Sequence, residues 1–287
     1  LQDEAVVLDP AIRAEYVNRL SAAGFMRVET TSFVNPTRVP QMADAEAVIA
    51  NLSEKSLAVS SALVLNERGL ERAQDAGIRE INYVVVVTDT FSQNNQGFDT
   101  VSSLNRWAMI RNRCEADRIK TTLTLAAAFG CPFEGEVSTS HLRSLLIRVA
   151  DTPPDEICMA DTIGVAVPTD VVRRLDLVTE VLPEVRTRLH CHNTRNSGLA
   201  NAYAGLIWGV GALDSSTGGL GGCPFSISST GNIPSEDLIY MLERMGYDTG
   251  IRLREVIDTA SWICGELDRE PDGMVVNAGV FPPEVNA

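Results

Sequence analysis

Residues 156–193, EICMADTIGVAVPTDVVRRLDLVTEVLPEVRTRLHCHN, contain a strand, a helix and a second strand in succession. The first and last parts, 156–162 and 187–193, are short runs bounded by turn residues, as in buried strands. Between them apolar residues recur with the period of a helix that ends at Pro183, at Val171, Val172, Leu175, Val178 and Leu182. Two strands joined through a helix pair in parallel, so this stretch predicts one βαβ unit.

The same alternation runs through the whole chain. Five further strands are expected, at 25–33, 57–65, 81–87, 121–127 and 211–217. Regular repetition of strand and helix predicts a (β/α)₈ (TIM) barrel, which has eight strands, so we expect the first strand upstream of Leu1. A doubly wound open sheet is the alternative, but no GxGxxG fingerprint follows an early strand. We expect one catalytic domain over 1–287, with a helical segment at about 235–268 packed on the barrel.

The composition excludes several classes of partner. The net charge of -14 argues against nucleic acid or an anionic membrane as the target, and no apolar run is long enough to span a bilayer. The six cysteines form no CxxC pair, which is typical of reduced thiols in the cytoplasm, or in the mitochondrial matrix of a eukaryote. Lys55 and Lys120 are the two lysines in the sequence. Both precede strands, away from the barrel mouth, so a Schiff-base mechanism is not expected.

Two of the three histidines lie two residues apart at the end of a predicted strand. His190 and His192 therefore point to the same face, where Arg188 joins them. At the C-terminal end of a barrel strand this face opens into the active-site mouth, and two neutral imidazoles there suit a divalent metal ion. The alternative is a pair of hydrogen-bonded histidines inside the barrel. His141, near the start of a helix, is expected to be a helix-end or surface residue.

Other polar groups follow the ends of neighbouring strands. Glu29 and Asp161 are strand-end carboxylates, although Asp161 also suits a loop or helix cap. The stretch DSSTGGLGGCPFS (214–226) carries Cys223 on a glycine-rich loop, where it is a candidate catalytic group or a buried thiol. Asn232 offers an amide oxygen to a metal, and Ser235 is expected to cap the next helix.

Several of these segments together resemble the 3-hydroxy-3-methylglutaryl-CoA lyase family of metal-dependent barrel enzymes. The shared motifs are LQDE, ETTSFVNPTRVPQMAD, GCPFEG, DTIGVAVP, HCHNT, DSSTGGLGGCPFS and GNIPSEDLIYMLE, which extend from Leu1 to about residue 268. The resemblance implies retro-Claisen cleavage of an acyl-CoA thioester to acetyl-CoA and a keto acid or ketone. It also implies a homo-oligomer, either a dimer or a tetramer.

The resemblance assigns roles to residues of this chain. His190, His192 and Asn232 would bind Mg²⁺ or Mn²⁺ together with an Asp expected upstream of Leu1, where an Arg that steadies the enolate is also expected. His190 is in addition counted among the catalytic residues. Cys223 would be the acid/base on the loop. The carboxylates expected around the site are Glu29, Asp161 and Glu236.

The chain departs from the family pattern where substrate is expected to bind. After HCH it continues with Asn193 and Arg195 rather than with the usual Asp-Thr-Tyr-Gly, and Thr124 and Ala126 replace Tyr and Ser on an earlier strand. We therefore expect a substrate related to 3-hydroxy-3-methylglutaryl-CoA but not identical with it, such as citramalyl-CoA. Arg195 is expected to hold a substrate carboxylate. The alternatives are a Claisen-type synthase of the isopropylmalate synthase kind and a non-enzymatic acyl-CoA-binding barrel.

Overall fold

The strands pair in parallel in the order in which they follow one another along the chain. The structure, a computed structural model, describes residues 1–222 and 231–283. Within this part, seven strands form one curled sheet in the order β1-β2-β3-β4-β7-β8-β9. Their bounds are Val28–Ser32 (β1), Ser60–Val64 (β2), Glu80–Val86 (β3), Lys120–Ala126 (β4), Glu156–Asp161 (β7), Arg186–Cys191 (β8) and Ala212–Asp214 (β9). The seven predicted strands are thereby confirmed. A short hairpin of β5 (Gly130–Cys131) and β6 (Gly135–Glu136) follows β4.

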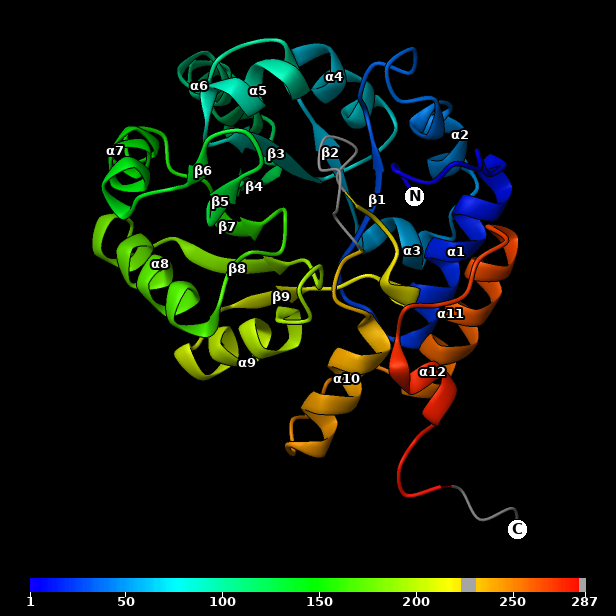
Figure 1. Ribbon diagram of the computed structural model, residues 1–287. Helices are drawn as coiled ribbons and strands as arrows, with labels where there is room; N and C mark the ends of the chain where they lie inside the picture. The colour runs from blue at the N-terminus through cyan, green and yellow to red at the C-terminus, as the bar shows by residue number, and fades with distance from the viewer. Residues whose placement is uncertain (223–230, 284–287) are drawn as a thin grey trace.

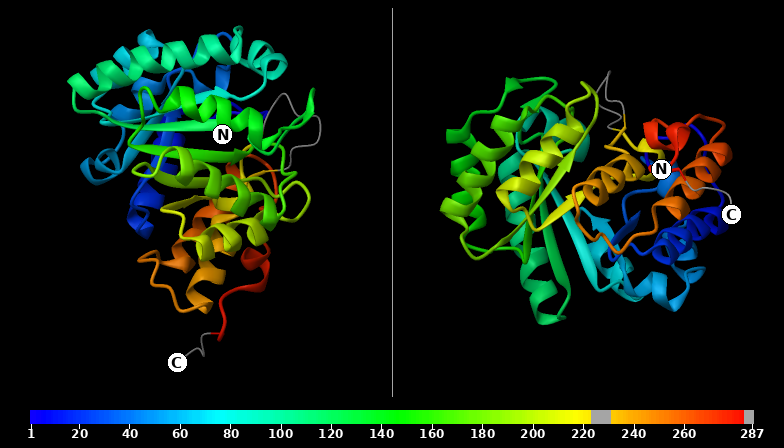
Figure 2. Two further views of the ribbon diagram at one scale, coloured as in Figure 1. Left: turned by 90° about the vertical axis from the view of Figure 1, so that its left-hand side faces the viewer. Right: turned by 90° about the horizontal axis from the view of Figure 1, so that it is seen from below.

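Helices cover the outer face of this sheet (Figures 1 and 2). The chain begins with a loop that leads into α1 (Pro10–Ala23). The helices that follow β1 to β4 are α2 (Ala45–Ala50), α3 (Glu54–Ala58), α4 (Glu67–Asp75), α5 (Asp89–Gln96), α6 (Thr100–Ala116) and α7 (Thr139–Val149). The remaining helices are α1 (Pro10–Ala23), α8 (Pro168–Val181), α9 (Gly198–Trp208), α10 (Ser235–Arg244), α11 (Leu253–Glu266) and α12 (Met274–Ala278), and the 3₁₀ turns are η1 (Pro40–Met42) and η2 (Thr217–Gly219).

Local capping shortens some predicted elements. The strand expected from residue 57 begins only at Ser60, because the Ser53 hydroxyl caps α3 and draws Leu57 into that helix. The strand expected over 211–217 ends at Asp214. The expected cap at Ser235 is wrong by one position: Pro234 precedes the first helical residue of α10, while the Ser235 hydroxyl pairs with Ser215 instead.

The outward-facing strand residues form the main hydrophobic core. Tyr83, Leu123 and Met159 lie at alternate positions on three neighbouring strands and are fully buried beneath the outer helices. Trp107 of α6 packs on Tyr83, with 5.9 Å between the ring centroids. The outward-facing apolar side chains of these strands thus fill the layer between the sheet and the helices. Most polar strand residues point to the inner face.

A chain of ion pairs crosses the base of the curled sheet. Arg27, just before β1, lies 3.0 Å from Glu80 of β3 and binds both oxygens of Glu156 of β7, at 2.5 and 3.2 Å. Arg188 of β8 lies 3.2 Å from Glu156 and 3.4 Å from Asp214 of β9. Because Glu156 and Arg188 are buried, each of these charges depends on its partners. The chain links strands from one edge of the sheet to the other.

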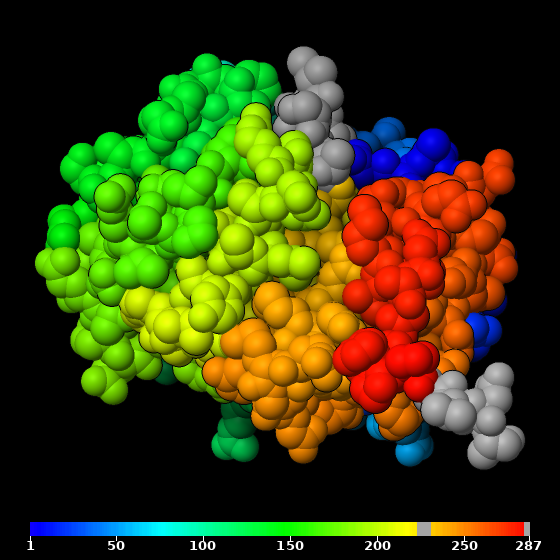
Figure 3. Space-filling view, turned by 60° about the horizontal axis from the view of Figure 1, so that its bottom comes forward, coloured from blue at the N-terminus to red at the C-terminus, as the bar shows by residue number. Residues whose placement is uncertain are grey.

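The C-terminal helices cover the side of the molecule where α1 lies. Helix α11 packs against α1 and η2, and Leu20, Leu220 and Ile263 share a second hydrophobic cluster there. Figure 3 shows the C-terminal segment, in orange and red, beside the N-terminal residues in blue. Within the described chain, no helix combines the length and the apolar character needed to cross a membrane.

We expect that Glu156→Gln lowers the free energy of unfolding by about 3 kcal/mol, because the amide leaves two arginines at the base of the sheet without their shared carboxylate. Urea unfolding followed by circular dichroism measures this. Glu180→Gln is the matched control, because Glu180 pairs with Arg143 on the surface, where solvent screens the charges. Equal losses in the two variants would contradict a special role of the buried ion pairs.

Candidate active site

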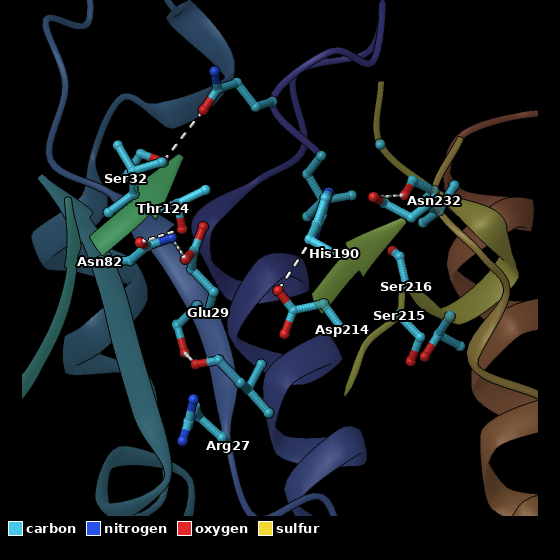
Figure 4. A pocket seen from close by; sticks show the side chains of 18 of the residues that line it. Arg27, Glu29, Ser32, Asn82, Thr124, His190, Asp214, Ser215, Ser216 and Asn232 are labelled. Atoms are coloured by element: carbon cyan, nitrogen blue, oxygen red, sulfur yellow. Dashed lines mark hydrogen bonds and ion pairs between the residues drawn. The ribbon is translucent and has the colours of Figure 1, made fainter. Parts of the chain in front are cut away.

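A cavity of about 670 Å³ opens at the C-terminal ends of the strands. Inward-pointing side chains at alternate strand positions line it, among them Asn82 and Val84 on β3, Thr124 and Ala126 on β4, Cys158 and Ala160 on β7, and Arg188 and His190 on β8. Asp214, Ser215, Ser216 and Asn232 line the side that is built after β9 (Figure 4). The predicted Glu29, Thr124, Ala126, His190, His192 and Asn232 thus meet in one place.

Asp214 fixes the ring of His190. His190 Nδ1 lies 3.3 Å from one oxygen of Asp214, and Arg188 Nη1 lies 3.4 Å from the other. Burial alone would raise the pKa of Asp214, but the charge of Arg188 and the hydrogen bond with His190 lower it to about 2. The ionised carboxylate favours the tautomer with the proton on Nδ1, which leaves His190 Nε2 free to act as a metal ligand.

Backbone pairing brings Asn232 to His192, which lies one residue past the end of β8. The two residues form an isolated antiparallel bridge, flanked by a hydrogen bond from Asn193 N to Gly231 O and one from Ile233 N to Cys191 O. The two imidazole rings lie 5.2 Å apart between centroids. Residues 40 positions apart in sequence therefore present two imidazoles and an amide to the same cavity.

Two glycines allow the backbone to close around Asn232. Gly221 has φ +93°, and a Cβ there would lie 2.7 Å from Asn232 Nδ2. A Cβ on Gly231 would lie 1.5 Å from Gly219 O, so only glycine fits at that position. In this cradle Asn232 Nδ2 donates to Leu220 O at 2.9 Å, which fixes the orientation of the amide.

The polar atoms presented here fit a divalent cation. Asn232 Oδ1 is buried and accepts no hydrogen bond within the described chain, as expected of an oxygen reserved for a ligand. His190 Nε2 and His192 add imidazole donors, and amide oxygen with imidazole suits Mg²⁺ or Mn²⁺. No group of three or more His, Cys, Asp or Glu side chains in residues 1–222 and 231–283 is arranged to bind a metal. A metal site here therefore needs the amide oxygen of Asn232 in addition to the two imidazoles. The Asp expected upstream of Leu1 lies outside this sequence.

Glu29 faces the cavity from β1, the opposite edge strand of the sheet. Its Oε2 accepts a hydrogen bond of 2.7 Å from Asn82 Nδ2, and Thr124 Oγ1 donates to Asn82 Oδ1 at 2.8 Å. Burial raises the pKa of Glu29, whereas the hydrogen bond from Asn82 and the charge of Arg188 oppose the rise. Figure 4 shows this carboxyl between Asn82 and the side of the cavity that carries His190 and Asp214.

Two predicted carboxylates lie outside the cavity lining and hold turns. Both oxygens of Asp161 accept backbone N–H groups, from Val165 at 2.9 Å and Ala166 at 3.1 Å, which is the turn-capping role considered as its alternative. Glu236 is fully buried under η2, where its Oε2 accepts from Gly218 N at 3.1 Å. Burial raises the pKa of Glu236 to about 7. In this structure both groups shape the loops around the site.

Arg195, His141 and the two lysines do not line the cavity. Arg195 Nη1 donates to Ile163 O and Gly164 O, each at 3.0 Å, so this guanidinium braces the loop after β7 and does not line the cavity. Cys223 lies outside the described residues. His141 is exposed in the first turn of α7, with Nε2 2.6 Å from Val87 O, which confirms its placement at a helix end. The two lysines do not line the cavity, as predicted.

Sequence reasoning missed Asp214 and Asn82. Asp214 ends β9 as a strand-end carboxylate, the same signal that singled out Glu29 and Asp161, so the pattern was sufficient to find it. Asn82 lies in the middle of a strongly apolar strand, INYVVVV, and its place beside Glu29 depends on the curl of the sheet.

The chain is similar to several known enzymes. A family model described as HMGL-like matches residues 1–263. An (R)-citramalyl-CoA lyase of Chloroflexus aurantiacus is 39% identical, over 99% of this chain and 93% of that protein. The mitochondrial hydroxymethylglutaryl-CoA lyase of Mus musculus is 33% identical, over 97% of this chain and 86% of that protein.

Solved structures agree with this likeness. The hydroxymethylglutaryl-CoA lyase of Pseudomonas aeruginosa superposes with a TM-score of 0.91 at 31% identity, over 96% of this chain and 92% of that one. An HMG-CoA lyase of Acinetobacter baumannii, in complex with coenzyme A and 3-methylmalate, gives a TM-score of 0.93 at 32% identity, over 100% of this chain and 94% of that one.

These matches confirm the predicted barrel fold and the predicted class of enzyme, since the chain superposes on the solved lyases over nearly its whole length. The relatives named above are carbon–carbon lyases that act on acyl-CoA thioesters, and the chain belongs with them to the HMGL-like family.

Proposed function

We propose that this lyase cleaves a 3-hydroxyacyl-CoA close to 3-hydroxy-3-methylglutaryl-CoA, with citramalyl-CoA as the first candidate. The observation that carries this proposal is the facing arrangement of Glu29 on one edge of the sheet and His190, His192 and Asn232 on the other, across a wall of small residues. A carboxylate opposite a set of neutral donors suits the removal of a proton from a bound hydroxyl group.

The reaction is a retro-Claisen cleavage. A base removes the proton of the 3-hydroxyl group, and the electron pair left on oxygen forms the new carbonyl bond of a keto acid. The adjacent carbon–carbon bond breaks, and its electron pair passes to the thioester enolate. A proton delivered to the enolate carbon then completes acetyl-CoA. Glu29 is the proposed acceptor of the hydroxyl proton, and Cys223 keeps its predicted role as the acid that protonates the enolate.

The proposed metal ligands are His190, His192 and Asn232. When bound there, Mg²⁺ or Mn²⁺ would lower the pKa of the substrate hydroxyl. Asp214 orients His190, and the contact of Asn232 Nδ2 with Leu220 O fixes the orientation of the amide. The oligomeric state and the cellular compartment stay predictions, and so does Arg195 as a substrate-carboxylate ligand.

One wall of the cavity is lined by small side chains, and this favours a substrate that differs from 3-hydroxy-3-methylglutaryl-CoA. Thr124, Ala126 and Ala160 line it where the acyl group is expected to lie, and Thr124 is bound to Asn82. The 39% identity to a citramalyl-CoA lyase, against 33% to the Mus musculus enzyme, favours citramalyl-CoA.

We expect acetyl-CoA release from a set of 3-hydroxyacyl-CoA thioesters in the presence of Mg²⁺ or Mn²⁺, with a higher kcat/KM for citramalyl-CoA than for 3-hydroxy-3-methylglutaryl-CoA. Coupled spectrophotometric assay of each thioester measures this. Equal cleavage of 3-hydroxy-3-methylglutaryl-CoA and every analogue would contradict the substrate assignment, and no release from any thioester would contradict the lyase proposal.

We expect that His192→Ala and Asn232→Ala each weaken Mn²⁺ binding at least tenfold, because each removes a ligand from a small set. Isothermal titration calorimetry and the electron paramagnetic resonance signal of free Mn²⁺ measure the affinity without an activity assay. His141→Ala is the control, since His141 lies on α7 away from the cavity. Wild-type affinity in both ligand variants would show that the cation binds elsewhere.

We expect Asp214→Asn to weaken Mn²⁺ binding by about 10- to 100-fold, because an amide no longer favours the tautomer of His190 that leaves Nε2 free. The same titrations measure this. Asp176→Asn is a suitable control, since Asp176 pairs with Trp208 Nε1 on the outer surface. The role of Asp214 is refuted if both variants bind Mn²⁺ equally well.

A further inference from the structure

The inner face of β3 and β4 carries a short hydrogen-bonded relay that ends on Glu29. Thr124 Oγ1 donates to Asn82 Oδ1, and Asn82 Nδ2 donates to Glu29 Oε2, at 2.8 and 2.7 Å. Asn82 and Thr124 are both buried, each with 8% of its surface exposed, so water competes little for these bonds. The relay joins three strands and is drawn in Figure 4.

The hydroxyl of Thr124 decides which end of the Asn82 amide meets Glu29. Because this hydroxyl donates to Oδ1, the amide is held with its NH₂ group toward the carboxylate. Turned by 180°, the amide would place its oxygen against the Glu29 carboxylate and lose that hydrogen bond, and Thr124 would have to accept from the amide instead of donating to it. The amide therefore acts as a fixed donor.

Glu29 needs such a donor because of the charges around it. Arg188 and His190 of β8 and Asp214 of β9 face it across the cavity, and Asp3 and Arg13 also line the cavity. Arg188 is bound to Glu156 and Asp214, and Arg27, two residues before Glu29, is bound to Glu80 and Glu156. Arg188 and Arg27 thus have carboxylate partners of their own, and Arg13 donates to the backbone oxygens of Gln41 and Ala43, while Asn82 supplies the direct hydrogen bond to Glu29.

We propose that Asn82, oriented by Thr124, is a positioning residue that holds the Glu29 carboxylate ionised and aimed at the hydroxyl group of the substrate. This inference rests on the proposed function, in which Glu29 accepts that proton. Neither Asn82 nor Thr124 transfers a proton itself. Their effect is to keep one oxygen of Glu29 occupied, so that the other faces the cavity.

Thr124→Val and Thr124→Ser form the matched test pair. Valine keeps the shape of threonine without its hydroxyl, and serine keeps the hydroxyl. We expect valine to lower kcat roughly tenfold, because the Asn82 amide that positions Glu29 loses the hydrogen bond that orients it. The acid limb of the kcat/KM profile should move up by about one pH unit, since loss of the hydrogen bond raises the pKa of Glu29. Serine should restore wild-type values within about twofold.

Asn82→Asp tests the same relay independently. It keeps the size of Asn82 but places a second carboxyl group beside Glu29, so the acid limb should move up by more than it does in Thr124→Val. Titration of ¹³C-carboxyl-labelled glutamate by NMR follows Glu29 in each variant without any turnover, and circular dichroism checks that each variant is folded.

Three results would overturn the inference: a wild-type acid limb in Thr124→Val, an equal loss in Thr124→Val and Thr124→Ser, or an unchanged NMR titration of Glu29. A wild-type enzyme that cleaves no thioester contradicts the proposed function instead, and the NMR titration still decides the relay in that case.

Discussion

The ion pairs at the base of the curled sheet are the constraint on which the rest of the structure depends. Arg27, Glu156, Arg188 and Asp214 come from both edges of the sheet and from strands between them, and the buried Glu156 and Arg188 depend on these partners to balance their charges. An inner face that carries charges tolerates no slip in strand register, because a shift of one residue would drive them into the apolar layer beneath the helices. The curl and the register are therefore fixed together.

The same charged residues also orient the side chains of the candidate active site. Arg188 holds one oxygen of Asp214, and the other oxygen orients His190, so the ion pairs continue into the proposed metal ligands. Toward the mouth the inner residues become small, with Ala126 and Ala160, and the cavity opens there. Layers of inward side chains in a barrel normally fill it. Here the charged side chains lie toward the base, and the small side chains nearer the mouth leave room for an acyl group.

Sequence patterns located most of the site because they report on strand ends. His190 and His192 were placed correctly, since residues at the carboxyl ends of parallel strands converge whatever the details of packing. Glu29 lines the cavity as expected, but the prediction that it ends its strand is wrong, because it is the second residue of β1 and reaches the cavity as an inward-pointing strand residue. Asp161 and Glu236 show where such reasoning stops. Both follow strands or begin helices, and the structure gives their oxygens to backbone N–H groups of turns. A carboxylate that caps a turn and one that faces a cavity have the same local sequence signature.

The sequence by itself determined the alternation of strand and helix, the histidine pair and the family resemblance, because these depend on periodicity and on motifs that are local in the chain. Tertiary structure alone decided that Asn82 meets Glu29 and that Asn232 meets His192. It also decided that Arg195 braces a loop. These contacts join residues on different strands and loops, and their partners are selected by the curl of the sheet and by glycine-permitted backbone approach, which no spacing along the chain records.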